Sequence, residues 1–244
     1  KCEIFQHLRS GGLAVLNGDD ALLNTVEAGD FRIVRCGQSA HCDVRITEIA
    51  DHGVEGITCT VVTARDSYAL SIPSPGAYMA YSASIGCGSG RRAGTEPGGD
   101  HSGVGQYEPA GSRMRVIRLP EGRMILDDCY NANPQSVTAA LEVLAKTDCD
   151  RKVAVLGDMG ELGDLTEQAH YNMGALAAML GVDLWWPSEP RPPRLPTEPP
   201  RAAVRCCICN EGGGPSELRE QLGPNTAMLV KASHSMHFGA LVKS

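Results

Sequence analysis

The most constraining feature of this sequence is a strand, a polar loop and a helix start that follow one another within eleven residues. The apolar residues 124–126 run into two aspartates and an asparagine-rich turn, and Pro134 then opens a helical pattern over 136–146. In open α/β sheets, ligands bind beyond the carboxyl ends of strands, and helix N-termini carry partial positive charge. The stretch therefore predicts either a binding loop or an ordinary connection whose Asp and Asn residues serve only as turn and cap residues.

Strands and helices alternate from residue 126 to the end of the chain. The expected strands are 124–126, 152–156, 182–184 and 228–231, and the expected helices are 136–146, 166–180, 216–222 and one after Ser235. This rhythm is typical of a parallel, doubly wound sheet. The earlier residues predict strands at 13–16, 31–36, 44–50, 56–63 and 68–72, the last three as a meander, a strand at 114–119, and helices at 1–9, 20–27 and 78–85. We therefore expect an α/β protein with two domains, 1–105 and 106–244.

Two tracts interrupt this pattern. Eight of the twenty residues 86–105 are glycine, and seven of the sixteen residues 185–200, in the longer tract 185–214, are proline. Such tracts are either natural linkers or segments translated out of frame. The second interpretation is favoured, because the α/β pattern resumes after each tract at about the expected length. No chemistry is inferred from either tract.

Composition and charge exclude several classes of protein. The net charge of −7 argues against a non-specific nucleic-acid binder, which needs a basic face. No run of eighteen apolar residues is present, so no membrane span is expected. The ten cysteines are scattered through α/β patterning, which favours reduced thiols in the cytoplasm. The chain starts without Met inside a helical pattern, so we expect it to be a fragment.

Three further polar loops stand between a strand and a helix. They are 17–20 (Asn-Gly-Asp-Asp), 157–163 (Gly-Asp-Met-Gly-Glu-Leu-Gly) and 231–236 (Lys-Ala-Ser-His-Ser-Met). The glycine spacing of 157–163 differs from a dinucleotide fingerprint, and Asp158 and Glu161 would repel a pyrophosphate. His170, on the next helix, is by itself expected to be a surface or capping residue. Lys231 and its neighbouring hydroxyls suit an anionic or peptide substrate, with an exposed Lys beside a Ser cap as the alternative.

Together these loops resemble the signatures of the MurF family of Mur ligases. Residues 127–136 resemble D-D-x-Y-N-A-N-P-x-S, 155–163 resemble V-L-G-D-M-x-E-L-G, 230–236 resemble V-K-G-S-R-S-M, and 17–20 resemble N-A-D-D. The resemblance implies the later half of a central ATPase domain (1–105) followed by a Rossmann-like C-terminal domain (106–244). It also implies an ATP- and Mg²⁺-dependent ligase that adds D-alanyl-D-alanine to UDP-N-acetylmuramoyl tripeptide through an acyl phosphate, in cytoplasmic peptidoglycan synthesis.

The resemblance further implies roles for individual residues. Lys1 matches a lysine that is carbamylated and helps to hold Mg²⁺, and Asp128 matches the aspartate that meets the nucleotide ribose. The implied catalytic residues are Lys1, Arg113 and Lys231, with Arg113 at the ATP phosphate. The implied cofactor-binding residues are Asn17, Arg113 and Asp128, and the implied substrate-binding residues are Asn131, Asn133 and Ser233.

The sequence also departs from the family pattern. Tyr78 and Ser82 stand where the family has His and Asn near the nucleotide, and His234 stands where Arg is usual. No G-x-x-x-x-G-K-[ST] phosphate loop is present in the sequence. We therefore expect the chain alone to be inactive. The alternatives are a decayed, non-catalytic relative that at most binds nucleotide or precursor, and another amide ligase such as a folylpolyglutamate synthase.

Overall fold

The computed structural model describes residues 2–90, 103–186, 207–208, 215–239 and 242 of the 244-residue chain. The chain divides into two compact units, Lys1–Glu108 (unit 1) and Pro109–Ser244 (unit 2). The structure confirms the predicted α/β fold class. No helix among the described residues is long and apolar enough to cross a membrane.

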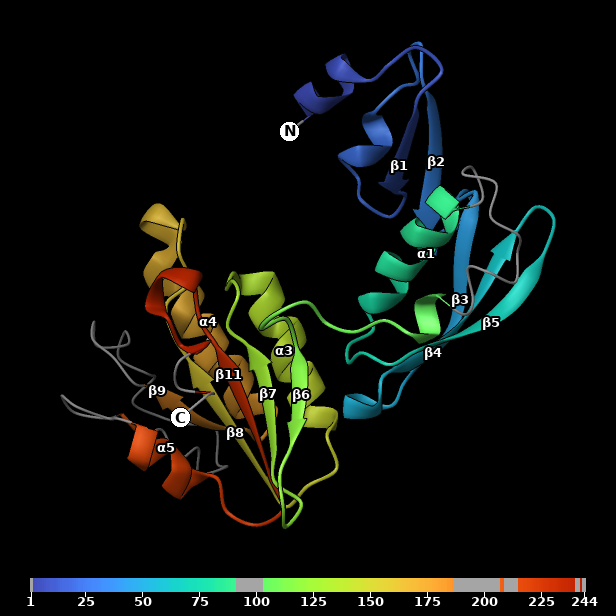
Figure 1. Cartoon of the computed structure of the whole chain (residues 1–244). Helices are drawn as coiled ribbons and strands as arrows, with labels where there is room; N and C mark the ends of the chain where they lie inside the picture. Colours follow the sequence, from blue (N-terminus) through green and yellow to red (C-terminus); the bar gives the residue numbers. More distant parts are fainter. Residues whose placement is uncertain (1, 91–102, 187–206, 209–214, 240–241, 243–244) are drawn as a thin grey trace. The chain divides into compact units, whose positions relative to one another are not determined.

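Unit 1 is built on a five-stranded mixed sheet in the order β1-β2-β3-β4-β5. Its strands are β1 (Leu13–Asn17), β2 (Arg32–Gly37), β3 (Val44–Asp51), β4 (Ile57–Thr63) and β5 (Ser67–Ile72). The first three run parallel, and β3, β4 and β5 form the predicted antiparallel meander. Helix α1 (Met79–Gly90) packs against one face of this sheet (Figure 1). The core of unit 1 lies between the two and includes Cys36, Ile46, Val61, Ala80 and Cys87.

Two sequence-based expectations for the helices of unit 1 were partly wrong. The helix expected at 1–9 is a 3-10 helix, η1 (Cys2–His7), whereas α1, which was expected to start over 78–85, does so and continues to Gly90. The helix expected at 20–27 is only the short 3-10 helix η2 (Leu23–Thr25). It ends there because Val26 is extended and its carbonyl accepts a hydrogen bond from the Arg35 guanidinium at 2.9 Å. A further 3-10 turn is η3 (Gly53–Glu55).

Unit 2 is a six-stranded sheet in the order β10-β9-β8-β11-β7-β6. Its strands are β6 (Arg115–Arg118), β7 (Met124–Asp128), β8 (Arg151–Leu156), β9 (Asp183–Trp186), β10 (Cys207–Ile208) and β11 (Thr226–Lys231). All run parallel except β6, which is antiparallel to β7. The strand expected at 114–119 is shorter because Met114 has a left-handed φ of +53°. Most of the tracts 86–105 and 185–214 lies outside the described residues.

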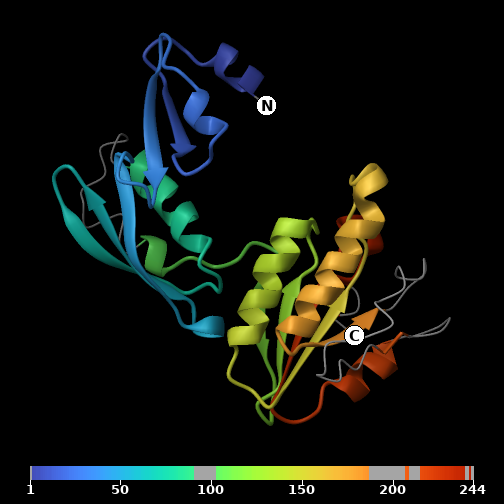
Figure 2. The ribbon, with the colours of Figure 1, turned by 180° about the vertical axis from the view of Figure 1, so that it is seen from behind.

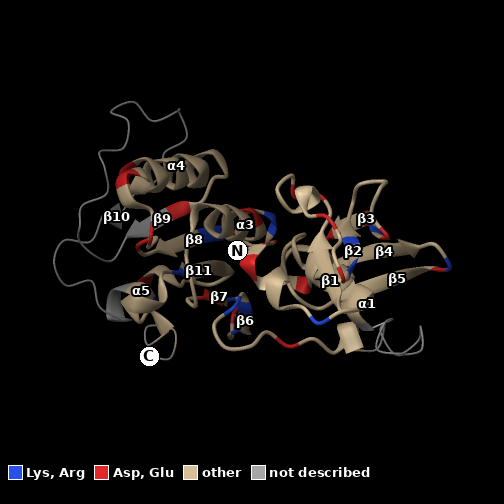
Figure 3. Ribbon diagram, turned by 90° about the horizontal axis from the view of Figure 1, so that it is seen from above, with Lys and Arg blue, Asp and Glu red and all other residues tan. Residues whose placement is uncertain are grey.

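Helices cover both faces of the unit 2 sheet, which confirms the doubly wound prediction. Helices α3 (Pro134–Lys146) and α4 (Thr166–Met179) lie side by side on one face (Figure 2). Helix α5 (Pro215–Gln221) lies on the other (Figure 3). The core beneath α5 includes Val153, Val155, Leu218, Met228, Val230 and Phe238. Two 3-10 turns, η4 (Gly163–Leu165) and η5 (His234–Met236), complete the unit, and η5 stands where a longer helix was expected.

Candidate functional site

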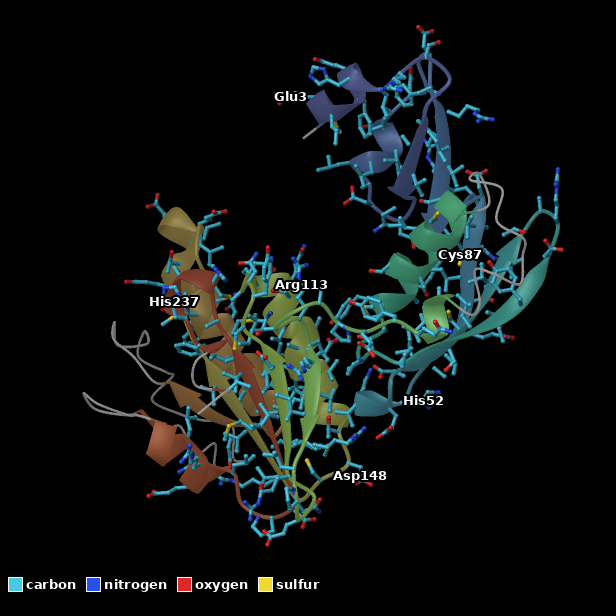
Figure 4. The ribbon with its side chains drawn as sticks, in the orientation of Figure 1. Glu3, His52, Cys87, Arg113, Asp148 and His237 are labelled. Carbon is cyan, nitrogen blue, oxygen red and sulfur yellow. The ribbon has the colours of Figure 1, made fainter. Side chains whose placement is uncertain are left out.

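The carboxyl ends of three neighbouring strands bring the predicted loops of unit 2 together. Lys231, the last residue of β11, lies opposite Asp128 of β7 on one side and Leu156 of β8 on the other. Strand β6 runs the other way, so Arg113, which precedes it, lies at the same edge. Figure 4 shows Arg113 and His237 at this end of unit 2 and Asp148 at the opposite end. We call this edge, with its loops, the carboxyl edge.

An ion pair between Asp128 and Lys231 forms the centre of the carboxyl edge. The Nζ of Lys231 lies 2.5 Å from Oδ2 of Asp128 and donates a second hydrogen bond to the carbonyl oxygen of Asn131 at 2.8 Å. The backbone N–H of Met114 donates to Oδ1 of Asp128 at 3.0 Å. Lys231 is only 2% exposed, and a buried charge is tolerated when it is paired and hydrogen-bonded. The pair therefore fixes the loop after β7 to the end of β11.

Tyr130 provides an aromatic platform next to this pair. The guanidinium carbon of Arg113 lies 3.8 Å from its ring centroid, within the range of a cation–π contact. His234 approaches the same ring with a centroid separation of 5.8 Å, and the His237 ring lies 6.2 Å from that of His234. The Tyr130 side chain is half exposed. Sequence reasoning missed Tyr130, although an aromatic residue inside a polar turn was a usable signal.

Asn131 and Asn133, in the loop after β7, make different hydrogen bonds. Asn133 caps α3: its Oδ1 accepts from the backbone N–H of Ser136 at 2.8 Å, and the Ser136 hydroxyl accepts from the Asn133 N–H at 3.1 Å. The Oδ1 of Asn131 accepts from the backbone N–H of Ala132 at 2.8 Å. Asn133 thus fulfils the cap interpretation, while substrate binding by either residue stays a prediction.

Asp127 and Cys129 flank Asp128 along the chain, and both are buried. In a strand, successive side chains point to opposite faces, so Asp127 lies on the side away from Asp128. Within the described part of the chain, Oδ1 of Asp127 has no hydrogen-bond partner. Burial, reinforced by the nearby carboxylates of Asp127 and Asp128, raises the pKa of the Cys129 thiol well above its usual range. Cys129 is therefore protonated at neutral pH and is no candidate nucleophile.

The loop 157–163 packs directly against the segment that follows β11. The carbonyl oxygen of Asp158 accepts from the backbone N–H of Ser233 at 3.0 Å. The hydroxyls of Ser233 and Ser235 lie 3.2 Å apart. His170 is 6% exposed and contacts this loop, so the surface interpretation of His170 was wrong.

A second polar cluster lies in unit 1, at the carboxyl ends of β1 and β2. The Oδ1 of Asn17 accepts from the N–H of Asp19 at 3.0 Å. The Asp19 carboxylate accepts from the N–H groups of Gln38 and Ser39 and from the Tyr81 hydroxyl, at 2.6, 2.9 and 2.9 Å. Partial burial opposes ionisation, but hydrogen bonds from Ser39, Gln38 and Tyr81 outweigh it and lower the pKa of Asp19 to about 2. Sequence reasoning missed Tyr81, because no local pattern links it to Asp19, which lies 62 positions earlier.

The expected magnesium ligand cannot be placed in this structure. Lys1 lies outside the described residues. Among the residues that are described, no group of three or more His, Cys, Asp or Glu side chains is arranged to hold a metal ion.

Comparison with known proteins identifies the family. Residues 112–234, half of the chain, match the family model "Mur ligase, glutamate ligase domain". The UDP-N-acetylmuramoyl-tripeptide–D-alanyl-D-alanine ligase of Escherichia coli K12 is 33% identical over 188 residues, which cover 75% of this chain and 41% of that protein. The enzyme of the same name from Synechocystis is 28% identical over 251 residues, covering 99% of this chain and 51% of that protein. The chain thus spans about half the length of such relatives, or less.

Solved structures show the same fold. MurF from Acinetobacter baumannii superposes with a TM-score of 0.80 at 24% identity, covering all of this chain and 53% of the other. MurF from Thermotoga maritima in complex with ADP gives a TM-score of 0.78 at 20% identity, covering 99% of this chain and 55% of the other. The match of the family model over the residues that build the carboxyl edge, together with this fold, shows that the chain belongs to the Mur ligase family.

Proposed function

We propose that this chain is part of an ATP-dependent ligase that adds D-alanyl-D-alanine to UDP-N-acetylmuramoyl tripeptide, as the names of its relatives describe. Unit 1 would be the later half of the ATP-binding domain, and unit 2 the C-terminal ligase domain. The reaction would belong to cytoplasmic peptidoglycan synthesis. The observation that carries the proposal is the convergence of Arg113, Asp128, Lys231 and Ser233 at the carboxyl edge.

The residues of the carboxyl edge fit a nucleotide in two respects. The two oxygens of the Asp128 carboxylate accept hydrogen bonds from Met114 and Lys231, and a carboxylate oxygen has capacity for a further donor such as a ribose hydroxyl. Arg113 is held on Tyr130, and a guanidinium in a fixed orientation suits a phosphate oxyanion. ATP would supply the phosphoryl group that activates the tripeptide carboxylate as an acyl phosphate.

Lys231 acts in this proposal by positioning its neighbours. At 2% exposure, with Asp128 and Asn131 as its partners, its ammonium group does not face solvent. It would hold Asp128 toward the nucleotide and the Asn131 backbone beside Ser233. Asn131 and Ser233 would then line the subsite of the attacking amine, with Asn133 fixing the helix behind them.

Lys1 is the residue that we propose as a ligand of Mg²⁺. That lysine, if carbamylated, would supply an oxygen ligand of the kind Mg²⁺ prefers. The described residues add no cluster of three or more His, Cys, Asp or Glu side chains that could hold the ion.

A ligation assay tests the proposal. The chain alone, supplied with ATP, UDP-N-acetylmuramoyl tripeptide and D-alanyl-D-alanine, should release no phosphate, because its sequence has no phosphate loop. Fused behind the amino-terminal portion of the Escherichia coli relative, it should release phosphate when D-alanyl-D-alanine is present and not when D- or L-glutamate replaces it.

The assay has two informative failures. Turnover by the chain alone would refute the claim that the catalytic machinery is incomplete. A folded fusion that binds ATP but ligates nothing would favour the decayed, non-catalytic relative, and one that accepts glutamate would favour a folylpolyglutamate synthase-like ligase.

A further inference from the structure

His170 is a buried residue of α4 whose two ring nitrogens both have backbone partners. Its Nδ1 lies 2.7 Å from the carbonyl oxygen of Thr166, and its Nε2 lies 3.2 Å from the backbone nitrogen of Met159. A carbonyl only accepts and an N–H only donates, so the ring proton sits on Nδ1 and Nε2 accepts. This arrangement requires the neutral, Nδ1-protonated imidazole. The Asp158 carboxylate also faces the ring, with Oδ1 3.8 Å from Nε2.

The backbone that His170 holds continues directly into the contact with the segment after β11. Asp158, the neighbour of Met159, accepts from the Ser233 N–H through its carbonyl oxygen at 3.0 Å. The backbone N–H of Asp158 also points to the sulfur of Met236 at 2.8 Å. Asp158 therefore contacts Ser233, which caps the start of η5, and Met236, its last residue.

The loop 157–159 and the segment 232–236 also pack in direct contact. A Cβ at Gly157 would lie 2.7 Å from the Cβ of Ala232 and 2.7 Å from the sulfur of Met236, closer than real Cβ contacts. Only a glycine fits at this approach. The position of the loop 157–159 therefore sets the position of 232–236, including His234, whose ring lies against Tyr130.

We propose that His170 is a positioning residue for Ser233 and His234. Its neutral ring fixes the backbone of Met159, and through Asp158 it holds the segment that presents Ser233 and His234 at the carboxyl edge. The consequence for ligation rests on the proposed function, whereas the coupling between His170 and Ser233 does not.

Three variants of the full chain separate positioning from general stability. His170→Leu removes both ring hydrogen bonds at similar size. His170→Gln keeps a side-chain acceptor for the Met159 N–H and serves as the rescue variant. Asn172→Ala is the matched control, because it removes an exposed side-chain hydrogen bond from Gln168 on the same helix, 2.9 Å long, that does not involve the loop 157–163.

Amide hydrogen exchange measured by NMR reads out the coupling. In His170→Leu, exchange of the Met159 and Ser233 amides should accelerate about tenfold or more, as expected when a buried N–H loses its partner, while the Leu229 amide in β11 is unchanged. His170→Gln should recover most of the protection, and Asn172→Ala should match the parent chain. An unchanged Ser233 amide, or equal acceleration of Ser233 and Leu229, would overturn the proposal.

The tautomer gives a second and independent test. Imidazole ¹⁵N shifts of the parent chain at neutral pH should show a protonated Nδ1 and an unprotonated Nε2. The opposite tautomer or a charged ring would overturn the proposal, even if no variant folded. An inactive fusion in the ligation assay would refute the proposed function and leave both of these results standing.

Discussion

Replacing Lys231 with methionine tests whether the buried ion pair organises the carboxyl edge. Lys231→Met keeps the length and apolar stem of the side chain and removes the charge. Asp128 then loses a contact of 2.5 Å, and the Asn131 carbonyl loses one of 2.8 Å. Removing one partner of a buried pair costs about 3–5 kcal/mol. We expect a loss of about 3 kcal/mol, at the low end, because the Asp128 side chain is 15% exposed and keeps its hydrogen bond from Met114.

The reverse substitution, Asp128→Leu, should cost more. It leaves an ammonium group that is 2% exposed with only the Asn131 carbonyl as a partner, so we expect about 4–5 kcal/mol. The double variant Asp128→Leu/Lys231→Met leaves no uncompensated charge. It should be more stable than either single variant, because apolar replacement of a buried pair is often nearly neutral.

Urea unfolding followed by tryptophan fluorescence measures these differences in unit 2, because both tryptophans of the sequence lie in β9. Glu121→Gln is the control: it breaks the more exposed pair with Arg123, and such a surface pair contributes at most about 1 kcal/mol. The reasoning is refuted if Lys231→Met unfolds within about 0.5 kcal/mol of the parent chain, or if the two single effects simply add in the double variant.

Three further predictions concern other parts of the site. Because the pKa of Asp19 is lowered to about 2 from an ordinary 3.8, its contribution to stability is present above pH 4 and is lost as the pH falls toward 2. The protection of the Gln38 amide relative to its intrinsic exchange rate should therefore fall in acid in the parent chain, and this fall should be absent in Asp19→Asn. Gly157→Ala should destabilise unit 2 by about 1–3 kcal/mol through overpacking, whereas Gly160→Ala, whose Cβ would lie 3.6 Å from its nearest neighbour, should be tolerated; equal urea midpoints would contradict this. Asn133→Ala should cost about 1 kcal/mol as a lost helix cap, and Asn133→Asp should restore stability in thermal unfolding; ligation that returns with Asp would exclude a specific role for the carboxamide.

The sequence predicted most strands and helices because their signals are local. The buried run of β11, the capped start of α3 at Asn133 and the meander β3–β5 each follow from patterning within a few residues. The helix expected at 20–27 failed because a tertiary hydrogen bond from Arg35 to the Val26 carbonyl competes with it. No local pattern contains such a contact.

The candidate site was predictable in its position and only partly in its contacts. Loops after parallel strands must meet at one edge, so the convergence of Asp128 and Lys231 followed from the β-α rhythm. Met114 has a left-handed backbone conformation, and its N–H donates to Asp128. Such a contact depends on tertiary packing and could not be predicted from local sequence. The same holds for the stacking of Arg113 on Tyr130.

The most direct test of the central claim, that the carboxyl edge of unit 2 binds the ligands, is an NMR titration of the full chain. ADP and then D-alanyl-D-alanine are added while backbone amide and arginine Nε signals are followed. We predict shifts at Arg113, Tyr130, Asn131 and Ser233, and none around Asp148 at the opposite end of the sheet. Saturable shifts confined to the Asp148 end, with the carboxyl edge unchanged, would contradict the central claim.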